Sequence, residues 1–463
     1  MQIKNEQDMI KDYLEDSSNL QGGYCEGVYL PEEENEVIEI VKENKMIKRP
    51  LTISGAGTGT VGGRIPFGGW VLSTEKMKET VNVDLNIKTA VFQPGITIEE
   101  IDNVLKDTGL MYAPDPTEKT AALGGTIATN ASGARGLRYG STRDHVNRIK
   151  VVTGEGKVLD ISRGEKFKNV PNYLVPDVKT SAGYYLKPHM DLIDLFIGSE
   201  GTLGIITEIE VNLVERPVQT FCFIAFLDSE DAALNFANDL ALKDDVISIE
   251  YFDKNTLEML RPKYNKIPNN ASTALYIEQA VKDSYLDFWD SFFKKHKLSE
   301  KKAWMGTNKK QQNTLWEFRH AIPETINELY KAYRQQKVSL DMSVPTHRFR
   351  ELVKIYNTNL DESRLFYIKF GHIGESHLHV NILPKNDEEI KKAQDLSLLF
   401  VTRAISMRGS ISAEHGVGKL KHSMLNEMYH EGGILGMIKV KKKFDPALIL
   451  GLDNIFPRKL FKR

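Results

Sequence analysis

Hydrophobic and polar positions in the first part of the chain alternate between helical and strand-like periods. Apolar residues recur at helical spacing within 32–44, where acidic residues gather near the start, so this pattern predicts a helix. Thr97 suits the N-cap of a further helix over 98–108, and residues 1–30 favour a helix followed by a loop. Short apolar runs predict strands at 51–53, 70–72 and 89–92.

The later pattern is that of a hairpin, a strand and then alternating strands and helices. A Gly-Glu-Gly turn joins the expected hairpin strands 149–153 and 158–162, and a further strand is expected over 205–213. Beyond Pro217 the alternation of strand-like and helical segments predicts an antiparallel sheet with helices on one face. Its strands are expected at 220–226, 247–252 and 274–279, and its helices at 228–242 and 285–296. We place a domain boundary near 214–218, which divides the chain into domains 1–216 and 217–463.

A run of closely spaced glycines follows the expected strand at 51–53. Glycine lets backbone N–H groups converge on an anion, so the segment RPLTISGAGTGTVGG predicts a pyrophosphate cradle. Gly57, Gly59 and Gly62 spell the GxGxxG dinucleotide pattern, but that pattern needs a helix directly after it. Here the segment Arg64–Gly69 contains a proline and two glycines and cannot start a helix. A flexible surface loop is the alternative interpretation.

Two further segments share the abundance of glycine and small residues. The stretch APDPTEKTAALGGTIATNASGARGLRYGSTRDHV shows little periodicity, and a long irregular loop inside a compact domain is unusual unless it is functional. Small residues also let a backbone lie against a flat ligand. The segment IGSEGTLGII then leads into the expected strand at 205–213.

Bulk composition excludes several classes of protein. The length of 463 residues predicts roughly two or three domains, and a net charge of −2 argues against a nucleic-acid binder. Two cysteines, Cys25 and Cys222, are too few for a disulfide framework or an iron–sulfur cluster. The polar N-terminus and the lack of a long apolar run predict a cytoplasmic protein. Basic and aromatic stretches at 439–444 and 456–463 suggest contact with a membrane surface or an electron-accepting partner, or else a solvated tail.

A histidine-rich segment, KFGHIGESHLHVNILP, carries the clearest chemical signal. From 376 to 382 apolar and polar residues alternate strictly, so His377, His379 and Asn381 share one face of a strand. Two glycines bracket a turn that brings His372 back beside this strand. Clustered imidazoles suit Zn²⁺ or a similar divalent ion, and a hydrogen-bonded polar strand face is the alternative.

A second motif, SAEHGVG, places a carboxylate beside an imidazole. Glu414 and His415 lie in a turn bounded by glycines. This histidine is a candidate base, and a structural histidine that caps the turn is the alternative.

The three glycine segments, in this order and with the two histidine motifs, resemble the vanillyl-alcohol oxidase and p-cresol methylhydroxylase superfamily. Within it, the chain is similar to the group of D-lactate dehydrogenase, glycolate oxidase and D-2-hydroxyglutarate dehydrogenase over roughly residues 25–460. The resemblance implies an α+β fold: a two-subdomain FAD-binding domain, then a C-terminal domain with an antiparallel sheet covered by helices. Residues 50–65 hold no histidine that could tether a flavin, so non-covalent FAD is expected. The implied FAD contacts are Gly55, Ala56, Gly57, Thr58, Gly59, Thr60, Pro94, Gly95, Pro114, Gly124, Gly125, Thr129, Ser132, Gly133, Tyr139, Gly140, Glu200, Gly204 and Ile206.

The resemblance also assigns roles around the substrate. It implies metal ligands at His372, His379 and Glu414, with an amide nearby at Asn381, and makes His415 the base near the flavin. His377 stands where the related group has an asparagine. The segment Trp316–Arg319 resembles the part of the family that supplies the arginine for the substrate carboxylate, so Arg319 is a candidate, although it could be a solvated helix arginine. Lys337 is a further candidate cation, although its spacing to the segment DMSVP differs from the family pattern.

The expected function is FAD-dependent oxidation of a D-2-hydroxy acid, with D-lactate first and glycolate or D-2-hydroxyglutarate behind it. The expected electron acceptor is a quinone, a cytochrome or an electron-transferring flavoprotein, and the chain could act as a homodimer or as a subunit of a complex. One alternative is a transferase like alkylglycerone-phosphate synthase, although a histidine run is expected there in place of Glu414 and His415. The other is a non-catalytic flavoprotein subunit, which need not keep the histidine and glutamate set.

Overall fold

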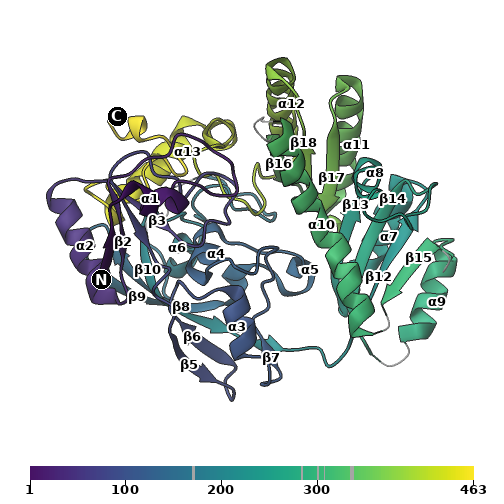
Figure 1. The fold of residues 1–463 in the computed structure, drawn as a ribbon, viewed down its shortest axis with the longest axis horizontal. Coiled ribbons are helices and arrows are strands. Elements are labelled where there is room, and N and C mark those ends of the chain that lie inside the picture. The colour runs from purple at the N-terminus through teal and green to yellow at the C-terminus, as the bar shows by residue number, and fades with distance from the viewer. Residues whose placement is uncertain are drawn as a thin grey trace.

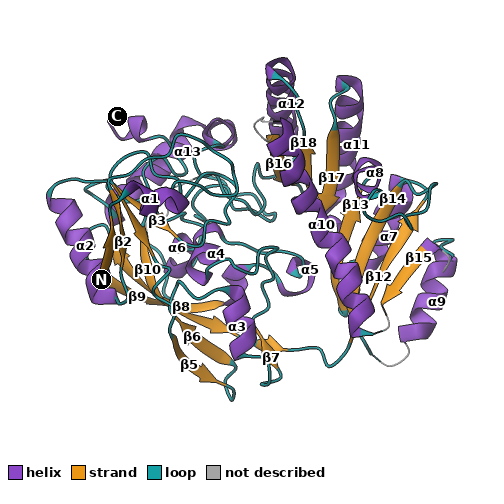
Figure 2. Cartoon of the chain, viewed as in Figure 1, coloured by secondary structure: helices purple, strands orange, loops and turns teal. Residues whose placement is uncertain are grey.

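The chain folds into two halves that face each other, as a computed structural model shows (Figure 1). The structure describes residues 1–168, 171, 173–282, 285–299, 302–306, 308–333 and 338–462. The first half holds residues up to about 216, and the second half holds the seven-stranded sheet with its helices. The connection after β11 (Val214–Glu215) leads from the first half to the second (Figure 2).

The first half contains two sheets. The smaller sheet has the strand order β1-β2-β4-β3; strands β2, β4 and β3 run parallel to one another, and β1 is antiparallel to β2. These strands are β1 (Gln2–Lys4), β2 (Gly27–Leu30), β3 (Leu51–Ser54) and β4 (Trp70–Ser73). Helix α2 (Glu34–Met46) packs Val37, Ile40 and Val41 against this sheet. The strands expected at 51–53 and 70–72 and the helix at 32–44 are therefore confirmed, within two residues at each end.

The larger sheet of the first half is antiparallel, with the order β5-β6-β10-β8-β9. Its strands are β5 (Thr80–Asp84), β6 (Thr89–Phe92), β8 (Val146–Thr153), β9 (Val158–Ser162) and β10 (Gly204–Asn212). Short helices accompany it: α3 (Ile98–Val104), α4 (Leu123–Thr129), α5 (Gly136–Tyr139) and α6 (Leu192–Phe196). The Thr97 hydroxyl accepts the Glu100 N–H in a full capping box, so the predicted N-cap is confirmed, and β7 (Leu110–Met111) pairs with β11.

The N-terminal segment differs from its expected helix. The structure has strand β1, a single helical turn α1 (Gln7–Ile10), a 3-10 turn at Lys11–Tyr13 and then an irregular segment before β2. Isolated helices this short are marginal, and here the edge of the small sheet offers backbone partners along 2–4. Tertiary pairing therefore outweighs local helical preference.

The second half is built on one antiparallel sheet with the order β15-β12-β14-β13-β17-β18-β16. The strands are β12 (Thr220–Leu227), β13 (Val246–Phe252), β14 (Thr273–Ala280), β15 (Ala303–Gly306), β16 (Val338–Ser343), β17 (Tyr367–Gly371) and β18 (His377–Ile382). The helices are α7 (Glu230–Leu240), α8 (Lys254–Leu260), α9 (Tyr285–Lys295), α10 (Lys309–Tyr333), α11 (Thr346–Ser363) and α12 (Asp387–Ser406).

Helices cover both faces of this sheet, and the expectation of helices on one face is wrong. One apolar core joins α7, α9, α11 and α12 to strand residues such as Phe223 and Val380. A second core joins α8 and α10 to strand residues such as Ile224 and Tyr276. The strands β12 and β13 are buried along nearly their whole length, which is typical of a sheet that is covered twice.

The end of the chain returns to the first half. Helix α13 (His422–Phe444) packs with the core of the larger first-half sheet, as the yellow ribbon in Figure 1 shows. Beyond it, Leu51 donates its N–H to Ile449, and Leu51 and Leu450 form a parallel bridge at the edge of the small sheet. The segment between α12 and α13 therefore crosses from the second half to the first.

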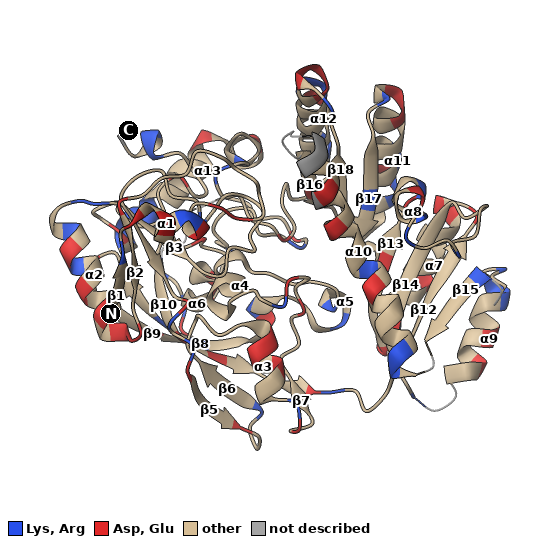
Figure 3. Cartoon of the chain, in the orientation of Figure 1, with Lys and Arg blue, Asp and Glu red and all other residues tan. Residues whose placement is uncertain are grey.

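Acidic and basic residues are interspersed over both halves (Figure 3). None of the helices in the described part of the chain is long and apolar enough to cross a membrane.

Candidate active site

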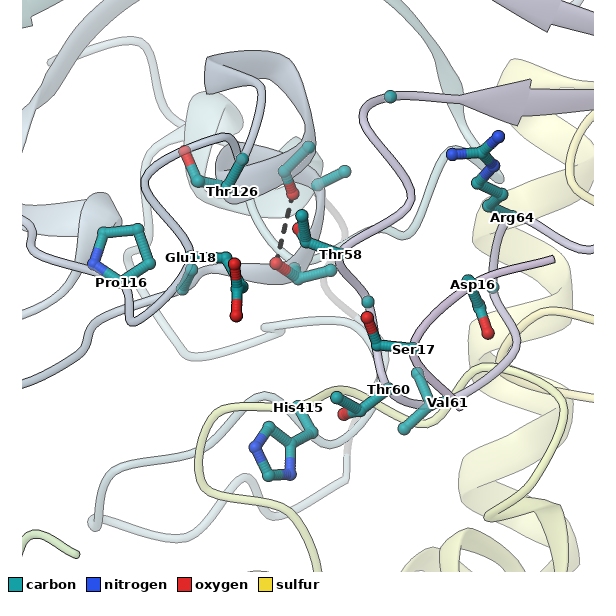
Figure 4. A pocket seen from close by; sticks show the side chains of 18 of the residues that line it. Asp16, Ser17, Thr58, Thr60, Val61, Arg64, Pro116, Glu118, Thr126 and His415 are labelled. Atoms are coloured by element: carbon teal, nitrogen blue, oxygen red, sulfur yellow. Dashed lines mark hydrogen bonds between the residues drawn. The ribbon is translucent and has the colours of Figure 1, made fainter. Parts of the chain in front are cut away.

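A cavity of about 360 Å³ lies between the two halves and the crossing segment, which is the part of the chain between α12 and α13. The first half contributes the glycine loop after β3, the segment around α4 and the turn before β10. The other side is formed by Phe370, His372, His379 and Asn381 from the second half and by Glu414 and His415 from the crossing segment. Figure 4 shows this cavity, with Thr58, Thr60 and His415 in its wall.

The glycine loop offers backbone donors to the cavity. Within the described part of the chain, no backbone hydrogen bond of the loops and turns uses an N–H group of residues 55–60. A Cβ placed on Gly59 would meet no atom within 4 Å, so the loop borders open space there. At Gly57, φ is 81°, a conformation that favours glycine. Unpartnered N–H groups beside two threonine hydroxyls fit the phosphates of a dinucleotide such as FAD.

Most of the predicted FAD contacts lie in the cavity wall, and four do not. Gly95 allows a close backbone approach, since a Cβ there would lie 2.0 Å from the Thr74 carbonyl oxygen. The Tyr139 carbonyl accepts from His145 Nε2 at 2.7 Å. Those outside the wall are Gly95, Pro114, Tyr139 and Gly140. Those in the wall are Gly55, Ala56, Gly57, Thr58, Gly59, Thr60, Pro94, Gly124, Gly125, Thr129, Ser132, Gly133, Glu200, Gly204 and Ile206.

Strand pairing brings the predicted imidazoles together. Strands β17 and β18 form an antiparallel pair in which Phe370 lies opposite His379, and the chain between them carries His372 back to the same place. The ring centroids of His372 and His379 are 5.2 Å apart. A Cβ on Gly371 would lie 2.7 Å from Cδ2 of His379, so glycine at this position makes room for the ring.

Glu414 completes the cluster from the crossing segment. Its Oε2 lies 3.3 Å from Nε2 of His372 and 3.8 Å from Nε2 of His379. Its Oε1 accepts hydrogen bonds from Ser132 and Lys179. One oxygen is therefore held by donors of the first half while the other faces the imidazoles.

This cluster fits a divalent cation. Nδ1 of His377 and Oδ1 of Asn381 are buried and have no hydrogen-bond partner in the described part of the chain. Burial, reinforced by the neighbouring imidazoles, holds the pKa of His379 well below its ordinary value, so its ring is neutral and can act as a ligand. Unpartnered buried acceptors are costly, and a bound cation would satisfy them. The residues that would hold it are His372, His379 and Glu414.

Glu250 links the cluster to Arg319. One carboxylate oxygen of Glu250 lies 2.7 Å from Nδ1 of His372, and the other accepts from Arg319 at 3.3 Å. Burial alone would lower the pKa of His372, but the carboxylates of Glu250 and Glu414 outweigh it and raise that pKa to about 10. A metal ion at this position must therefore displace a proton from His372.

Arg319 is a buried side chain, so it is not a solvated helix arginine. It belongs to α10, is 7% exposed, and donates to the hydroxyl of Thr117 at 3.0 Å. Thr117 lines the cavity. Arg319 is not one of the lining residues and lies behind Thr117, to which it donates a hydrogen bond. The other candidate cation, Lys337, lies outside the described residues.

His415 is held by a carboxylate that the sequence pattern did not single out. Asp341 on β16 is fully buried; it accepts the backbone N–H of His415 at 2.8 Å, and its Oδ2 lies 3.2 Å from Nδ1 of the same residue. Burial lowers the pKa of His415 to about 4, although Asp341 opposes that shift. The imidazole is therefore neutral near pH 7, with Nε2 free to accept a proton.

Several charged residues of the site escaped the sequence-based prediction, and Glu250, Asp341 and Lys179 are those that contact the histidine and glutamate cluster or His415. Glu250 and Asp341 are the single charged residues of the strands VISIEYF and VSLDMS, and a lone charge in a buried strand was the available signal. Lys179 lies in a segment without periodicity; its Nζ is 3.0 Å from Glu375 Oε2. The two carboxylates Glu375 and Glu414 outweigh burial and raise the pKa of this lysine.

Comparison with known families gives two matches along the chain. The family described as FAD linked oxidases, C-terminal domain, matches residues 216–452. The family described as FAD binding domain matches residues 25–162.

Curated relatives match over nearly the whole length. The chain is 31% identical over 448 residues to glycolate oxidase subunit GlcD of Bacillus subtilis, covering 95% of this chain and 90% of the relative. It is 30% identical over 438 residues to D-lactate dehydrogenase of Archaeoglobus fulgidus, covering 92% and 90%. It is 28% identical over 453 residues to D-2-hydroxyglutarate dehydrogenase of Stutzerimonas stutzeri, covering 93% and 90%.

Solved structures share the fold at low identity. An alkyldihydroxyacetonephosphate synthase superposes with a TM-score of 0.69 at 18% identity, covering 99% of this chain and 82% of that one. A 4-ethylphenol oxidase from Gulosibacter chungangensis superposes with a TM-score of 0.71 at 15% identity, covering 99% and 95%. With the family matches, these likenesses confirm the expected α+β fold: a two-subdomain FAD-binding domain and a C-terminal domain with a helix-covered sheet.

Proposed function

Because this chain belongs to the FAD-linked oxidases, we propose that it is a dehydrogenase that oxidises a D-2-hydroxy acid to the 2-oxo acid. We place D-lactate first among substrates, with glycolate and D-2-hydroxyglutarate behind it, since relatives bear all three names. The observation that supports the proposal is one shared cavity. The glycine loop, the His372–His379–Glu414 cluster and His415 all line it.

In the proposed reaction, the substrate loses its hydroxyl proton and a hydride from Cα. FAD supplies the hydride acceptor when bound, and a divalent cation supplies a positive charge that favours the ionised hydroxyl. His415 takes the proton at Nε2, because Asp341 holds Nδ1. The neutral state of His415 near pH 7 makes it ready for this role.

Arg319 and the buried carboxylate beside it orient the substrate. A guanidinium has five N–H donors, and Arg319 uses two of its nitrogens on Thr117 and Glu250. We propose that a remaining donor, or the one on Thr117, turns to the substrate carboxylate. Glu250 then fixes the guanidinium and the His372 ring in one network.

The proposed cofactor state is non-covalent FAD, with Zn²⁺ as the first candidate cation. The electron acceptor is a quinone, a cytochrome or an electron-transferring flavoprotein; one relative, from Arabidopsis thaliana, is named D-lactate dehydrogenase [cytochrome], mitochondrial. Another is named a subunit, so we propose that this chain works as a homodimer or within a complex. A cytoplasmic location with peripheral contact at the inner membrane face stays a prediction.

Anaerobic flavin reduction tests the proposal. The purified yellow holoprotein is mixed with D-lactate, L-lactate, glycolate or D-2-hydroxyglutarate, and the flavin absorbance is followed with and without a chelator. We expect bleaching by D-lactate but not L-lactate, and loss of bleaching after chelation. If no acid bleaches the flavin, the dehydrogenase proposal is wrong, and a transferase or a non-catalytic subunit takes its place.

A further inference from the structure

We propose that His377 is a fourth protein ligand of the cation that His372, His379 and Glu414 would hold. The inference rests on the metal site of the proposed function and deepens it. The resemblance places an asparagine at this position in related proteins, so the ligand would distinguish this chain from them.

One ring nitrogen of His377 is already fixed by a carboxylate. Its Nε2 lies 2.6 Å from Oδ1 of Asp341, and both side chains are fully buried. An ionised carboxylate only accepts, so this contact assigns the proton to Nε2 and leaves a lone pair on Nδ1. A metal-binding histidine typically donates its other N–H to a carboxylate in this way, which fixes the ring and makes it more basic.

The second ring nitrogen has no partner. Nδ1 of His377 is buried and makes no hydrogen bond in the described part of the chain. Leaving a buried acceptor unsatisfied is unfavourable, and a metal ion bound to it would remove that cost. A purely structural histidine would be expected to use both nitrogens or to expose one.

The ring also lies beside the other ligands. Its centroid is 4.7 Å from that of His379 and 5.4 Å from that of His372. Ligand atoms of His372, His377, His379 and Glu414 all lie within 4.8 Å of one another. Ligand atoms about 2.0–2.1 Å from one ion lie roughly 3–4 Å from one another. Small side-chain movements would therefore bring all four residues within coordination distance of the same ion.

Four protein ligands restrict which ion can support activity. A tetrahedral ion would have no position left for a substrate, so activity requires an ion that accepts five or six ligands. Three imidazoles and one carboxylate also favour Zn²⁺, Co²⁺ or Ni²⁺ over Mg²⁺ and Ca²⁺, which prefer oxygen. An asparagine at 377 would shift that preference back toward oxygen-binding ions.

Metal binding without turnover tests the inference. Holoprotein is stripped with a chelator and reloaded with Zn²⁺ or Co²⁺ in competition with a chromophoric chelator. The variants are His377→Asn, His379→Ala as a ligand-loss reference, and His296→Asn as a control. His296 directly follows α9, which lies at the edge of the second half away from the first half in Figure 1, and its Nε2 is 3.0 Å from Asp239. We expect His377→Asn to weaken Zn²⁺ binding at least 10-fold, and His296→Asn to leave it unchanged.

X-ray absorption of the Zn²⁺-loaded wild type counts the imidazoles directly. Three imidazoles support the inference, and a count of two overturns it even if His377→Asn folds poorly. Equal Zn²⁺ affinity of wild type and a folded, FAD-loaded His377→Asn also overturns it. If the wild type itself binds neither ion, the metal part of the proposed function fails as well, whereas flavin reduction by D-lactate would still stand on its own.

Discussion

The Oδ2 atom of Asp341 accepts the backbone N–H of His415 at 2.8 Å and stands 3.2 Å from Nδ1 of the same residue. Two contacts from one buried oxygen fix both the turn and the ring. The imidazole therefore presents Nε2 in a defined direction at the cavity wall. Such a pair can hold a proton acceptor ready before the substrate arrives.

His415→Ala should abolish flavin reduction while FAD remains bound. Loss of a positioned base costs about 10²–10⁴-fold in rate, and the FAD contacts of the first half are untouched. Stopped-flow absorbance under anaerobic conditions measures the rate, and the visible spectrum of the desalted variant measures bound FAD. Full turnover by this variant would reassign His415 to a structural role.

Gly371→Ala should impair metal binding and activity together. At this position φ is 112°, and a Cβ would lie 2.7 Å from Cδ2 of His379, so the ring must move. Gly164→Ala is the matched control, because its φ is 95° but a Cβ there meets no atom within 4 Å. Both variants should lose about 1–2 kcal/mol of stability from backbone strain. Only Gly371→Ala should weaken Zn²⁺ binding, and equal Zn²⁺ affinities would contradict this account.

Arg319→Lys should raise the KM for the 2-hydroxy acid more than it lowers kcat. A lysine keeps the charge beside Glu250, but its single nitrogen cannot donate in fixed directions to Glu250 and to the substrate carboxylate at once. Steady-state kinetics with D-lactate give the two constants, and we expect KM to rise about 10–100-fold. If both constants stay at wild-type values while the melting temperature falls, Arg319 serves only to pair with Glu250.

Deprotonation of the buried Lys419 should increase the free energy of unfolding as the pH rises above about 8. Burial lowers the pKa of this lysine from 10.5 to about 8, although Asp453, Glu200 and Asp16 oppose the shift. Between about pH 8 and pH 10.5 the unfolded chain then binds more protons than the folded one, so the free energy of unfolding increases with pH.

Melting temperatures of wild type and Lys419→Met at pH 7.5 and 9.5 measure this contribution. The variant loses the donor to Asn454 and to the Gly62 and Gly63 carbonyls, so it should melt lower at both pH values. The relevant quantity is the pH-dependent change, which should be smaller in the variant by the equivalent of about 1–3 kcal/mol. Identical changes in both proteins would show that another group is responsible.

Local patterns predicted the parts of the site that depend on neighbouring residues. The alternation around His379 placed three polar side chains on one face of a strand, and β18 shows that arrangement. The glycine loop was expected after a strand, and it follows β3 directly. Both features need only the period of a strand or the freedom of glycine.

The parts that escaped prediction depend on pairing between distant segments. Glu250 meets His372 only because β13 pairs with β17, and Asp341 meets His377 only because β16 pairs with β18. A single acidic residue within an apolar strand gives no indication of its partner. Helices on both faces of the second sheet were missed for the same reason, since apolar runs do not tell which helix covers which face.

The residues that follow α13 pair with Leu51, and this pairing affects how the newly synthesised chain can fold. Domains generally fold as they emerge from the ribosome, beginning with the N-terminal one. Here Ile449 and Leu450 can join the small sheet of the first half only after the whole second half has been synthesised. Because Glu414 and His415 also follow the strands of the second half in the sequence, a nascent chain can complete neither that sheet nor the cavity wall until the second half has left the exit tunnel.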